Sequence, residues 1–223
     1  AVASAPMDPL TCIRQLDVPH LEQSIQRRAL LYDKGGEEHY NLISALHKSM
    51  RNSDPDAAVY WLARMVEAGE DPLYIARRLV RFASEDVGNA DPQALSVAIA
   101  AKDAVHFMGM PEGNTALAQL AIYLATAPKS NRAALAIWNA RQVVRDGAVG
   151  EVPTHLRDAH YQGAAQLGHG VGYQNPHDDP EGWVEQQYLP DAQLGQRFYE
   201  PTVHGDEAAV ADSMHRHRGE APS

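Results

Sequence analysis

The sequence predicts an all-α fold, in which a helical bundle occupies about the first 147 residues and an irregular, aromatic-rich segment follows. Three observations lead to this prediction. Asp-Pro pairs at residues 54–55, 71–72 and 91–92 each precede apolar residues spaced three and four apart. No stretch sustains the alternation of apolar and polar residues that is typical of a strand. Beyond Gly147 the helical spacing ends, while prolines, glycines and aromatic residues become frequent.

The Asp-Pro pairs predict where helices begin. An aspartate side chain accepts hydrogen bonds from the unpaired N–H groups of a first turn, and proline fits the first helical position. Three helices should therefore start near residues 55, 72 and 92, and end near Gly69, Gly88 and Gly109. In the third, Leu95, Ile99 and Val105 mark the apolar face.

The remaining helices follow from apolar spacing and from helix-breaking residues. Leu21 to Leu31 predicts one helix, and another starts at about residue 38. Pro111 should open a helix that ends before Pro128, and Ser130 should cap one that runs to Gly147. A short polar helix is expected over residues 206–218. The connections are short, so consecutive helices should pack as antiparallel neighbours.

Composition narrows the classes of function. The 223 residues carry a formal net charge of −10. Residues 1–147 hold 15 Lys/Arg against 17 Asp/Glu, and residues 148–223 hold 4 against 12. This balance excludes a uniformly basic nucleic-acid coat but allows a local basic patch. The longest nearly apolar run, Leu117 to Ala127, is too short to cross a bilayer, which takes about 20 residues.

The start of the chain and its single cysteine bear on location. Cys12 has no second cysteine with which to form an internal disulfide, which favours an intracellular protein. The sequence begins without Met and has neither the basic nor the long apolar region of a signal peptide. We therefore expect a piece of a longer protein that resides in the cytoplasm.

No motif for catalysis or nucleotide binding is present in this chain. Lys129-Ser130 lacks the glycines of a P-loop, and no Gly-x-Ser-x-Gly elbow occurs. We therefore expect no enzyme activity and no cofactor for this chain. Pro128 to Asn131 lies at an expected helix start, which favours a plain cap over an anion contact. The spacing of the late histidines does not predict a metal site: His155, His160, His169, His177 and His204.

Clustered basic residues leave two interpretations open. They fall in three groups on expected helices: Lys48 and Arg51, Arg77 and Arg78, and Lys129 and Arg132. Together they are candidates for contacts to DNA backbone phosphates. Alternatively, Asp54, Glu85 and Asp86 pair with them and hold the helices together.

Separated blocks of sequence carry a resemblance to a known family. They are Tyr32–Gly36, His39–Tyr40, Ile43–Ala45, Lys48–Arg51, Ser53–Ala58, Leu62–Met65, Glu67–Pro72, Ile75–Leu79, Ala83–Gly88, Leu124–Asn131, Val152–Arg157 and Gln187–Pro190. Over roughly residues 21–207 the chain resembles the C-terminal region of the replication-associated recombination protein A family, also called MgsA. Werner helicase-interacting protein is a eukaryotic relative. The small departures, Asn52, Asn89 and Gly113, lie at helix ends.

The resemblance implies a AAA+ ATPase that is related to clamp-loader subunits and acts at replication forks. Residues 1–31 would be the tail of the ATPase lid region, and residues 32–147 a helical bundle resembling the clamp-loader oligomerisation domain. Residues 148–223 would pack on that bundle or on a neighbouring subunit. ATP and magnesium would bind in the missing N-terminal part. The implied partners are the chain itself, as a homotetramer, DNA at forks, and single-strand-binding protein. The implied location is the cytoplasm, in association with the nucleoid.

The sequence thus predicts a tetramerisation domain without catalytic residues. The alternative is a DNA-contacting module that uses the six clustered cations. A metal-dependent hydrolase built on the late histidines is a third, less favoured hypothesis.

Overall fold

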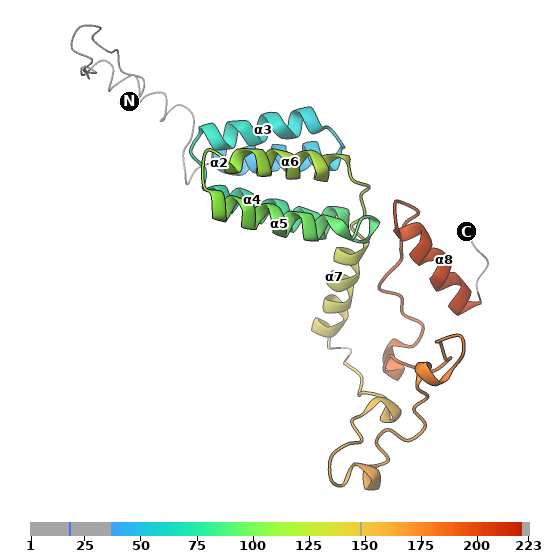
Figure 1. Ribbon diagram of the computed structural model, residues 1–223. Coiled ribbons are helices and arrows are strands. Elements are labelled where there is room, and N and C mark those ends of the chain that lie inside the picture. Colours follow the sequence, from blue (N-terminus) through green and yellow to red (C-terminus); the bar gives the residue numbers. More distant parts are fainter. Residues whose placement is uncertain (1–17, 19–36, 148, 220–223) are drawn as a thin grey trace. The chain divides into compact units, whose positions relative to one another are not determined.

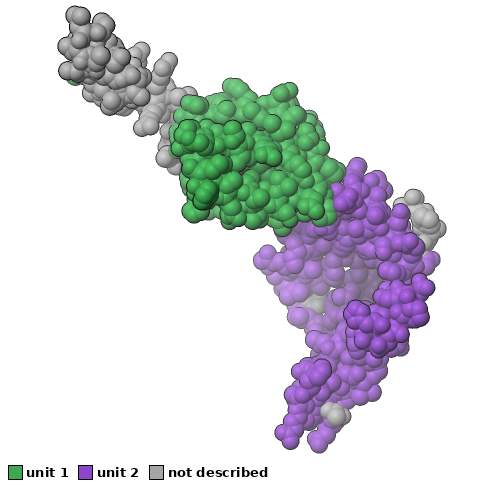
Figure 2. Space-filling model, in the orientation of Figure 1, with its two compact units in different colours: residues 1–87, 91–129 green, residues 88–90, 130–223 purple. Residues whose placement is uncertain are grey.

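The structure is a computed structural model that describes residue 18 and residues 37–147 and 149–219. Within this part of the chain every regular element is a helix and no strand occurs, which confirms the all-α prediction. The helix expected over Leu21 to Leu31 lies outside the described residues. Contacts divide the chain into unit 1, residues 1–87 and 91–129, and unit 2, residues 88–90 and 130–223 (Figure 2).

In the described part of unit 1, residues 37–87 and 91–129, five α-helices form a bundle (Figure 1). Their bounds are α2, Glu37–Arg51; α3, Pro55–Glu67; α4, Pro72–Phe82; α5, Gln93–Met108; and α6, Gly113–Thr126. Consecutive helices α2 and α3, α4 and α5, and α5 and α6 pack on one another, and α6 also packs on α3. The core is apolar and fully buried, with Leu46, Met65, Leu79, Phe82, Leu117, Leu120 and Leu124 among its larger side chains.

The three expected aspartate caps are present. Asp54 Oδ1 accepts from the Ala57 N–H at 2.9 Å, and Asp71 Oδ1 accepts from the Leu73 N–H at 3.0 Å. Asp91 Oδ1 accepts from the Gln93 N–H at 3.1 Å. Each bond satisfies a donor that the first helical turn leaves unpaired, so these helices begin within a residue or two of the predicted positions.

Two details differ from the predicted elements. Pro111 lies in the turn before α6 and does not open the helix, which begins two residues later at Gly113. The segment after α4 widens into a π-helical turn, Ala83–Val87, followed by a 3-10 turn, Gly88–Ala90. The wider turn buries the carboxylate of Asp86, which the sequence pattern placed on an ordinary helix.

The buried face of α5 matches the prediction at Val105 but differs at Leu95 and Ile99. Leu95 and Ile99 are 44% and 40% exposed, whereas Ala94, Ala98 and Val105 are buried. Spacing alone does not distinguish the two faces, because both carry apolar residues at helical intervals. The structure places the small alanines inside the bundle and leaves the larger side chains on the outside.

Unit 2 contains two long helices and an irregular segment. Its helices are α7, Arg132–Arg145, and α8, Glu207–Arg218, and short 3-10 turns interrupt residues 149–206. The Asp206 N–H donates to the Ala90 carbonyl at 2.9 Å, which ties the start of α8 to the 3-10 turn Gly88–Ala90. The predicted change of character after Gly147 and the predicted late helix are both observed. No described helix has the length and apolarity needed to span a membrane.

Candidate assembly and ligand surfaces

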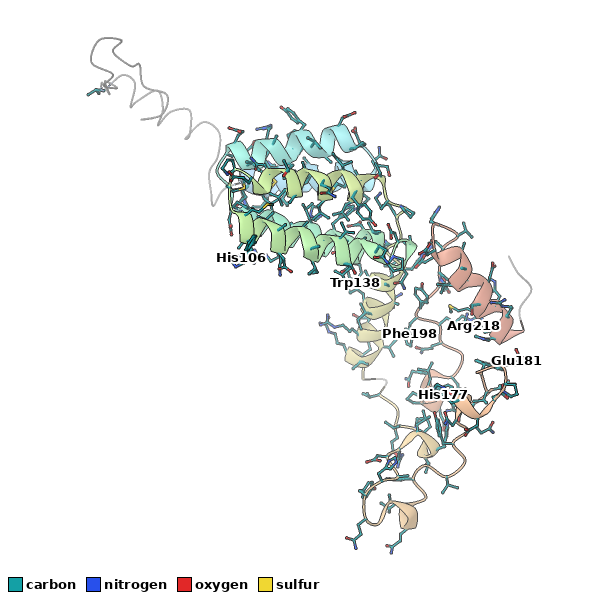
Figure 3. The ribbon with its side chains drawn as sticks, in the orientation of Figure 1. His106, Trp138, His177, Glu181, Phe198 and Arg218 are labelled. Carbon is teal, nitrogen blue, oxygen red and sulfur yellow. The ribbon has the colours of Figure 1, made fainter. Side chains whose placement is uncertain are left out.

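Helix α7 exposes an apolar stripe. Ile137, Trp138 and Val144 are 55%, 46% and 59% exposed, and their spacing of i, i+1 and i+7 puts them on one side of the helix (Figure 3 labels Trp138). Within the described residues none of the 14 residues of α7 is buried. Ser130 caps the helix as predicted, because its hydroxyl accepts from the Arg132 N–H at 3.2 Å. The helix is therefore well formed, but its apolar stripe has no cover in the described part of the chain.

A second exposed apolar region lies on α5 and at the turn between α5 and α6. Phe107 is 91% exposed, and Met108 and Met110 are 45% and 39% exposed. These residues lie at the C-terminal end of α5 and just beyond it, and Leu95 and Ile99 are exposed earlier on the same helix. Large apolar side chains gathered on an outer surface are typical of sites that contact another protein.

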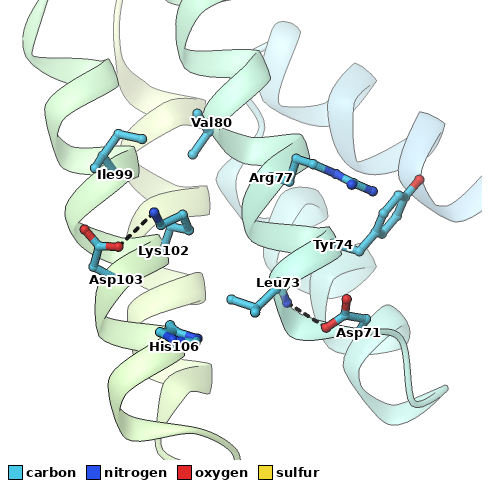
Figure 4. Close-up of a pocket in the computed structure, with 9 residues that line it drawn as sticks. All are labelled: Asp71, Leu73, Tyr74, Arg77, Val80, Ile99, Lys102, Asp103 and His106. Atoms are coloured by element: carbon cyan, nitrogen blue, oxygen red, sulfur yellow. Dashed lines mark hydrogen bonds and ion pairs between the residues drawn. The ribbon is translucent and has the colours of Figure 1, made fainter.

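A groove between α4 and α5 adjoins part of this face (Figure 4). Its volume is about 480 Å³, and Leu73, Val80 and Ile99 give it an apolar lining. Arg77 and Lys102 are among the charged residues of the groove, and the Arg77 guanidinium lies over the Tyr74 ring at 5.2 Å from its centroid. The groove thus combines an apolar lining with charged residues of both signs, among them Asp71 and Arg77.

Two of the six candidate DNA-contacting cations bond within unit 1. Arg51 donates to both carboxylate oxygens of Asp86, from Nε to Oδ1 at 2.6 Å and from Nη2 to Oδ2 at 3.2 Å. This bond to Asp86 raises the pKa of Arg51. Lys129 Nζ donates to the carbonyl oxygens of Ala125, at 2.9 Å, and Ala127, at 2.5 Å. For these two residues the geometry favours the structural interpretation that the sequence left open.

The other four candidates are distributed over both units. Lys48, Arg77 and Arg132 are exposed, and Arg78 is half-buried. Arg132 belongs to unit 2, whereas the other three belong to unit 1. Arg78 lies close enough to His47 to lower its pKa. The structure thus joins Arg51, Arg78 and Lys129 to the polar cluster around Asp86, a partner that the structural interpretation of the sequence had named. The buried His47 in this cluster was not foreseen.

His47 lies at the centre of that cluster. Its ring packs edge-on against Phe82 at 5.5 Å between centroids, and the side chain is buried. Burial, followed by the charge of Arg78, lowers the pKa of His47 to about 4. The ring therefore stays neutral within the bundle, because burial and the charge of Arg78 outweigh the opposing effect of Asp86. No feature of the sequence around His47 distinguished it from a surface histidine on α2.

Glu207 is the fully buried carboxylate of unit 2. Its Oε1 accepts from the Tyr199 hydroxyl at 2.9 Å, and its Oε2 accepts from the Thr202 N–H and hydroxyl at 2.8 Å and 2.7 Å. Burial alone would raise the pKa of Glu207, but the bonds from Ser130, Thr202 and Tyr199 outweigh it and lower that pKa. Through these hydrogen bonds the carboxylate holds the start of α8 against the segment that contains Tyr199 and Thr202. The polar composition of the helix did not reveal this role.

The late histidines contact single neighbours. His155 Nε2 lies 2.7 Å from the Gln187 carbonyl, His160 Nδ1 lies 2.9 Å from Asp158, and His169 Nδ1 lies 2.8 Å from the Tyr161 hydroxyl. In the described ranges no three His, Cys, Asp or Glu side chains come together in a way that would hold a metal ion. His177 lies in a 3-10 turn capped by Asn175, whose side chain accepts from the His177 N–H.

The described residues form an α-helical domain with exposed apolar surfaces on α5 and α7. Comparison with known proteins gives the family. A family model described as "MgsA AAA+ ATPase C terminal" matches residues 52–218. A second family model, described as "AAA C-terminal domain", matches residues 1–51. The chain therefore belongs to the MgsA family of AAA+ ATPases, as the resemblance in its sequence predicted.

The relatives include bacterial and eukaryotic proteins. Replication-associated recombination protein A of Haemophilus influenzae is 44% identical over 92% of this chain and 46% of its own length. The protein of that name from Escherichia coli K12 is 45% identical over 84% of this chain and 42% of its own length. ATPase WRNIP1 of Dictyostelium discoideum is 49% identical over 79% of this chain and 20% of its own length. The chain thus spans less than half the length of these relatives.

Proposed function

We propose that this domain assembles a AAA+ ATPase of replication-associated recombination into a homotetramer. The observation that carries the proposal is α7, a regular 14-residue helix that buries none of its residues within the described chain. Exposing Ile137, Trp138 and Val144 to water costs free energy that a second copy of the domain would recover. The proposed number of four subunits is taken from the family resemblance.

The outer face of α5 supports the same proposal. A helix that served only its own bundle would bury its larger apolar residues, yet α5 buries alanines and exposes Leu95 and Ile99. Obligate interfaces resemble a protein core cut in half, with large apolar residues on both sides. We assign α5 and α7 to the contacts between subunits.

The chemistry of the parent protein would lie outside this chain. The family is one of AAA+ ATPases, and the matched region is C-terminal. We infer that ATP and magnesium bind to the ATPase part that precedes this region, while the domain described here positions the subunits at DNA. This role would place the assembly in the cytoplasm, at the chromosome.

Light scattering coupled to size-exclusion chromatography tests the proposal on this chain. Four copies of 24.4 kDa make 97.6 kDa, and we expect that mass at both low and high salt because the contacts are apolar. The double variant Ile137→Glu, Val144→Glu should elute at a lower mass. Asn139→Glu, an exposed change elsewhere on α7, should keep the wild-type mass.

The possible outcomes separate the parts of the proposal. A wild-type chain that is monomeric at tens of micromolar would refute assembly by this domain. A stable dimer would refute the number four and retain the assembly role. If Asn139→Glu lowers the mass of the assembly as much as the double variant does, the interface is not specific to the apolar stripe.

A further inference from the structure

We propose that a basic pocket in unit 2 binds a nucleoside polyphosphate, with its phosphates on three arginines and its base stacked on a tryptophan. The pocket has a volume of about 700 Å³. Its cationic and aromatic lining consists of Trp183, Arg197, Arg216, His217 and Arg218. Figure 3 labels Arg218 on the last turn of α8. The site is separate from the apolar surfaces assigned to assembly.

The positive charge of this pocket contrasts with its surroundings. Residues 148–223 hold four Lys/Arg against 12 Asp/Glu, and three of those four cations line this one pocket. Glu185 is the only carboxylate among the nine lining residues, so the pocket has a net charge of about +2 when His217 is neutral. Concentrated guanidinium groups match the closely spaced oxygens of a di- or triphosphate, which they bind by charge-assisted hydrogen bonds.

The aromatic part of the pocket fits one base. The rings of Trp183 and His217 stack with 4° between their planes and 5.6 Å between centroids. A base that joins this stack gains about 1–3 kcal/mol, the value typical of base–aromatic contacts. The pocket thus offers one aromatic stack, Trp183 with His217, beside three arginines. This combination suits a ligand with one base and several negative charges. A single strand of DNA carries one charge per base and would need further platforms along its path.

Stabilisation of α8 does not by itself explain why these cationic and aromatic residues line one pocket. Cations in a last turn favour the helix macrodipole, and this accounts for Arg216 and Arg218 on α8. It does not account for Trp183 and Arg197, which come from the irregular segment and line the same pocket. Three separate stretches of chain therefore contribute to the site, as expected for a surface formed by folding.

Isothermal titration calorimetry with ATP in the absence of divalent metal tests this inference on the full chain. The chain has no P-loop, so a second nucleotide site does not confuse the measurement. We expect one site per chain. Trp183→Ala should weaken ATP binding at least tenfold, and Arg216→Ala with Arg218→Ala should weaken it at least tenfold as well. Circular dichroism checks that each variant remains folded.

Matched controls test whether the effects are local. Tyr173→Ala removes an exposed aromatic residue of the same segment, and Arg81→Ala with Lys102→Ala removes two exposed cations of unit 1. Both should bind ATP as the wild-type chain does. Equal weakening by the Arg81, Lys102 pair would show non-specific charge attraction and overturn the site.

Two competing ligands test the chemical class. Inorganic tripolyphosphate should compete more weakly than ATP, and equal competition would overturn the role of the base. A 15-nucleotide oligo-dT should also compete more weakly than ATP per site. If the oligonucleotide binds more tightly than ATP, the proposed ligand class is wrong and the pocket binds a nucleic acid strand. None of these outcomes depends on the oligomeric state, so the inference and the proposed assembly can fail separately.

Discussion

At the scale of single residues, the polar groups inside the two units distinguish this domain from a plain apolar bundle. Unit 1 buries His47 beside Asp86, which bonds Arg51, and unit 2 buries Glu207 among hydroxyl and amide donors. Buried polar groups stabilise a fold only when they are paired, so each is a point where one substitution has a large effect.

His47 predicts how the stability of unit 1 depends on pH. The folded ring resists protonation until about pH 4, whereas an unfolded histidine takes up its proton at about 6.5. The unfolded chain therefore binds the additional proton as the pH falls through this window, and folding loses up to about 3 kcal/mol between pH 7 and pH 4. Urea titrations followed by circular dichroism measure this loss.

Two variants separate His47 from the other titrating groups. His47→Leu should remove most of the loss between pH 7 and pH 4, because leucine has no proton to gain. His106→Leu, on the exposed surface of α5, should leave the loss unchanged. An identical pH profile for wild type and His47→Leu would refute the assignment. Arg51, Arg78, Glu85 and Asp86 are the charged groups around the ring.

Glu207 predicts a local effect in unit 2. Glu207→Ala leaves the buried donors of Tyr199 and Thr202 without their acceptor, at a cost of about 2–4 kcal/mol. Trypsin should then cut at Arg197 faster than in the wild type, because the segment before α8 opens more often. Glu200→Ala, on an exposed residue, is the control. Because the folded pKa of Glu207 is lowered, its contribution is present above the unfolded pKa and is lost as the pH falls through the folded value.

At the scale of elements, helix starts were the most predictable feature. Asp54, Asp71 and Asp91 act through bonds to N–H groups two or three residues away, so local sequence determines them. The π-helical turn that buries Asp86 was not predictable, because Asp86 bonds Arg51, 35 residues away. On α5 the prediction was right for Val105 but wrong for Leu95 and Ile99 for a similar reason, since the choice between two apolar faces depends on neighbouring helices.

The candidate sites show the same division between local and distant effects. The six cations were visible as clusters, but only the fold shows that Arg51 and Lys129 bond internally. The pocket of Trp183 and Arg218 was missed, because its parts are far apart in the sequence. The small number of cations in residues 148–223 was the feature that could have drawn attention to it.

The 3-10 turn Gly88–Ala90 before α5 gives a prediction at the scale of elements. Gly88 has a φ of +53°, and a Cβ atom there would come within 2.7 Å of the Ser130 carbonyl oxygen. Gly88→Ala therefore adds a steric clash to backbone strain. Gly69 has a φ of +81° with open space around it, so Gly69→Ala adds strain alone, about 1 kcal/mol. In urea titrations Gly88→Ala should be the more destabilising by about 1 kcal/mol or more; equal losses would show that the carbonyl moves away freely.

At the scale of the whole molecule, assembly predicts a stability that depends on concentration. Subunits that bind each other when folded stabilise one another by mass action. The Tm of the wild-type chain should rise as its concentration increases from about 1 to 100 µM. The Ile137→Glu, Val144→Glu variant should lose this dependence, while Asn139→Glu retains it. Scanning calorimetry provides the measurement, and a wild-type Tm that is independent of concentration would contradict assembly through α7.

The bond from Asp206 to Ala90 also has a consequence for synthesis. The core of unit 1 uses residues from Leu42 to Ala127, so its last parts leave the ribosome well before α8 does. Unit 2 closes only when Asp206 and Glu207 arrive at Gly88–Ala90 and Ser130, near the end of the stretch described. The helical bundle is thus free to fold during translation, whereas the segment with the basic pocket matures last. A ribosome that stalls between residues 130 and 205 would therefore carry a finished bundle beside an exposed, unclosed α7.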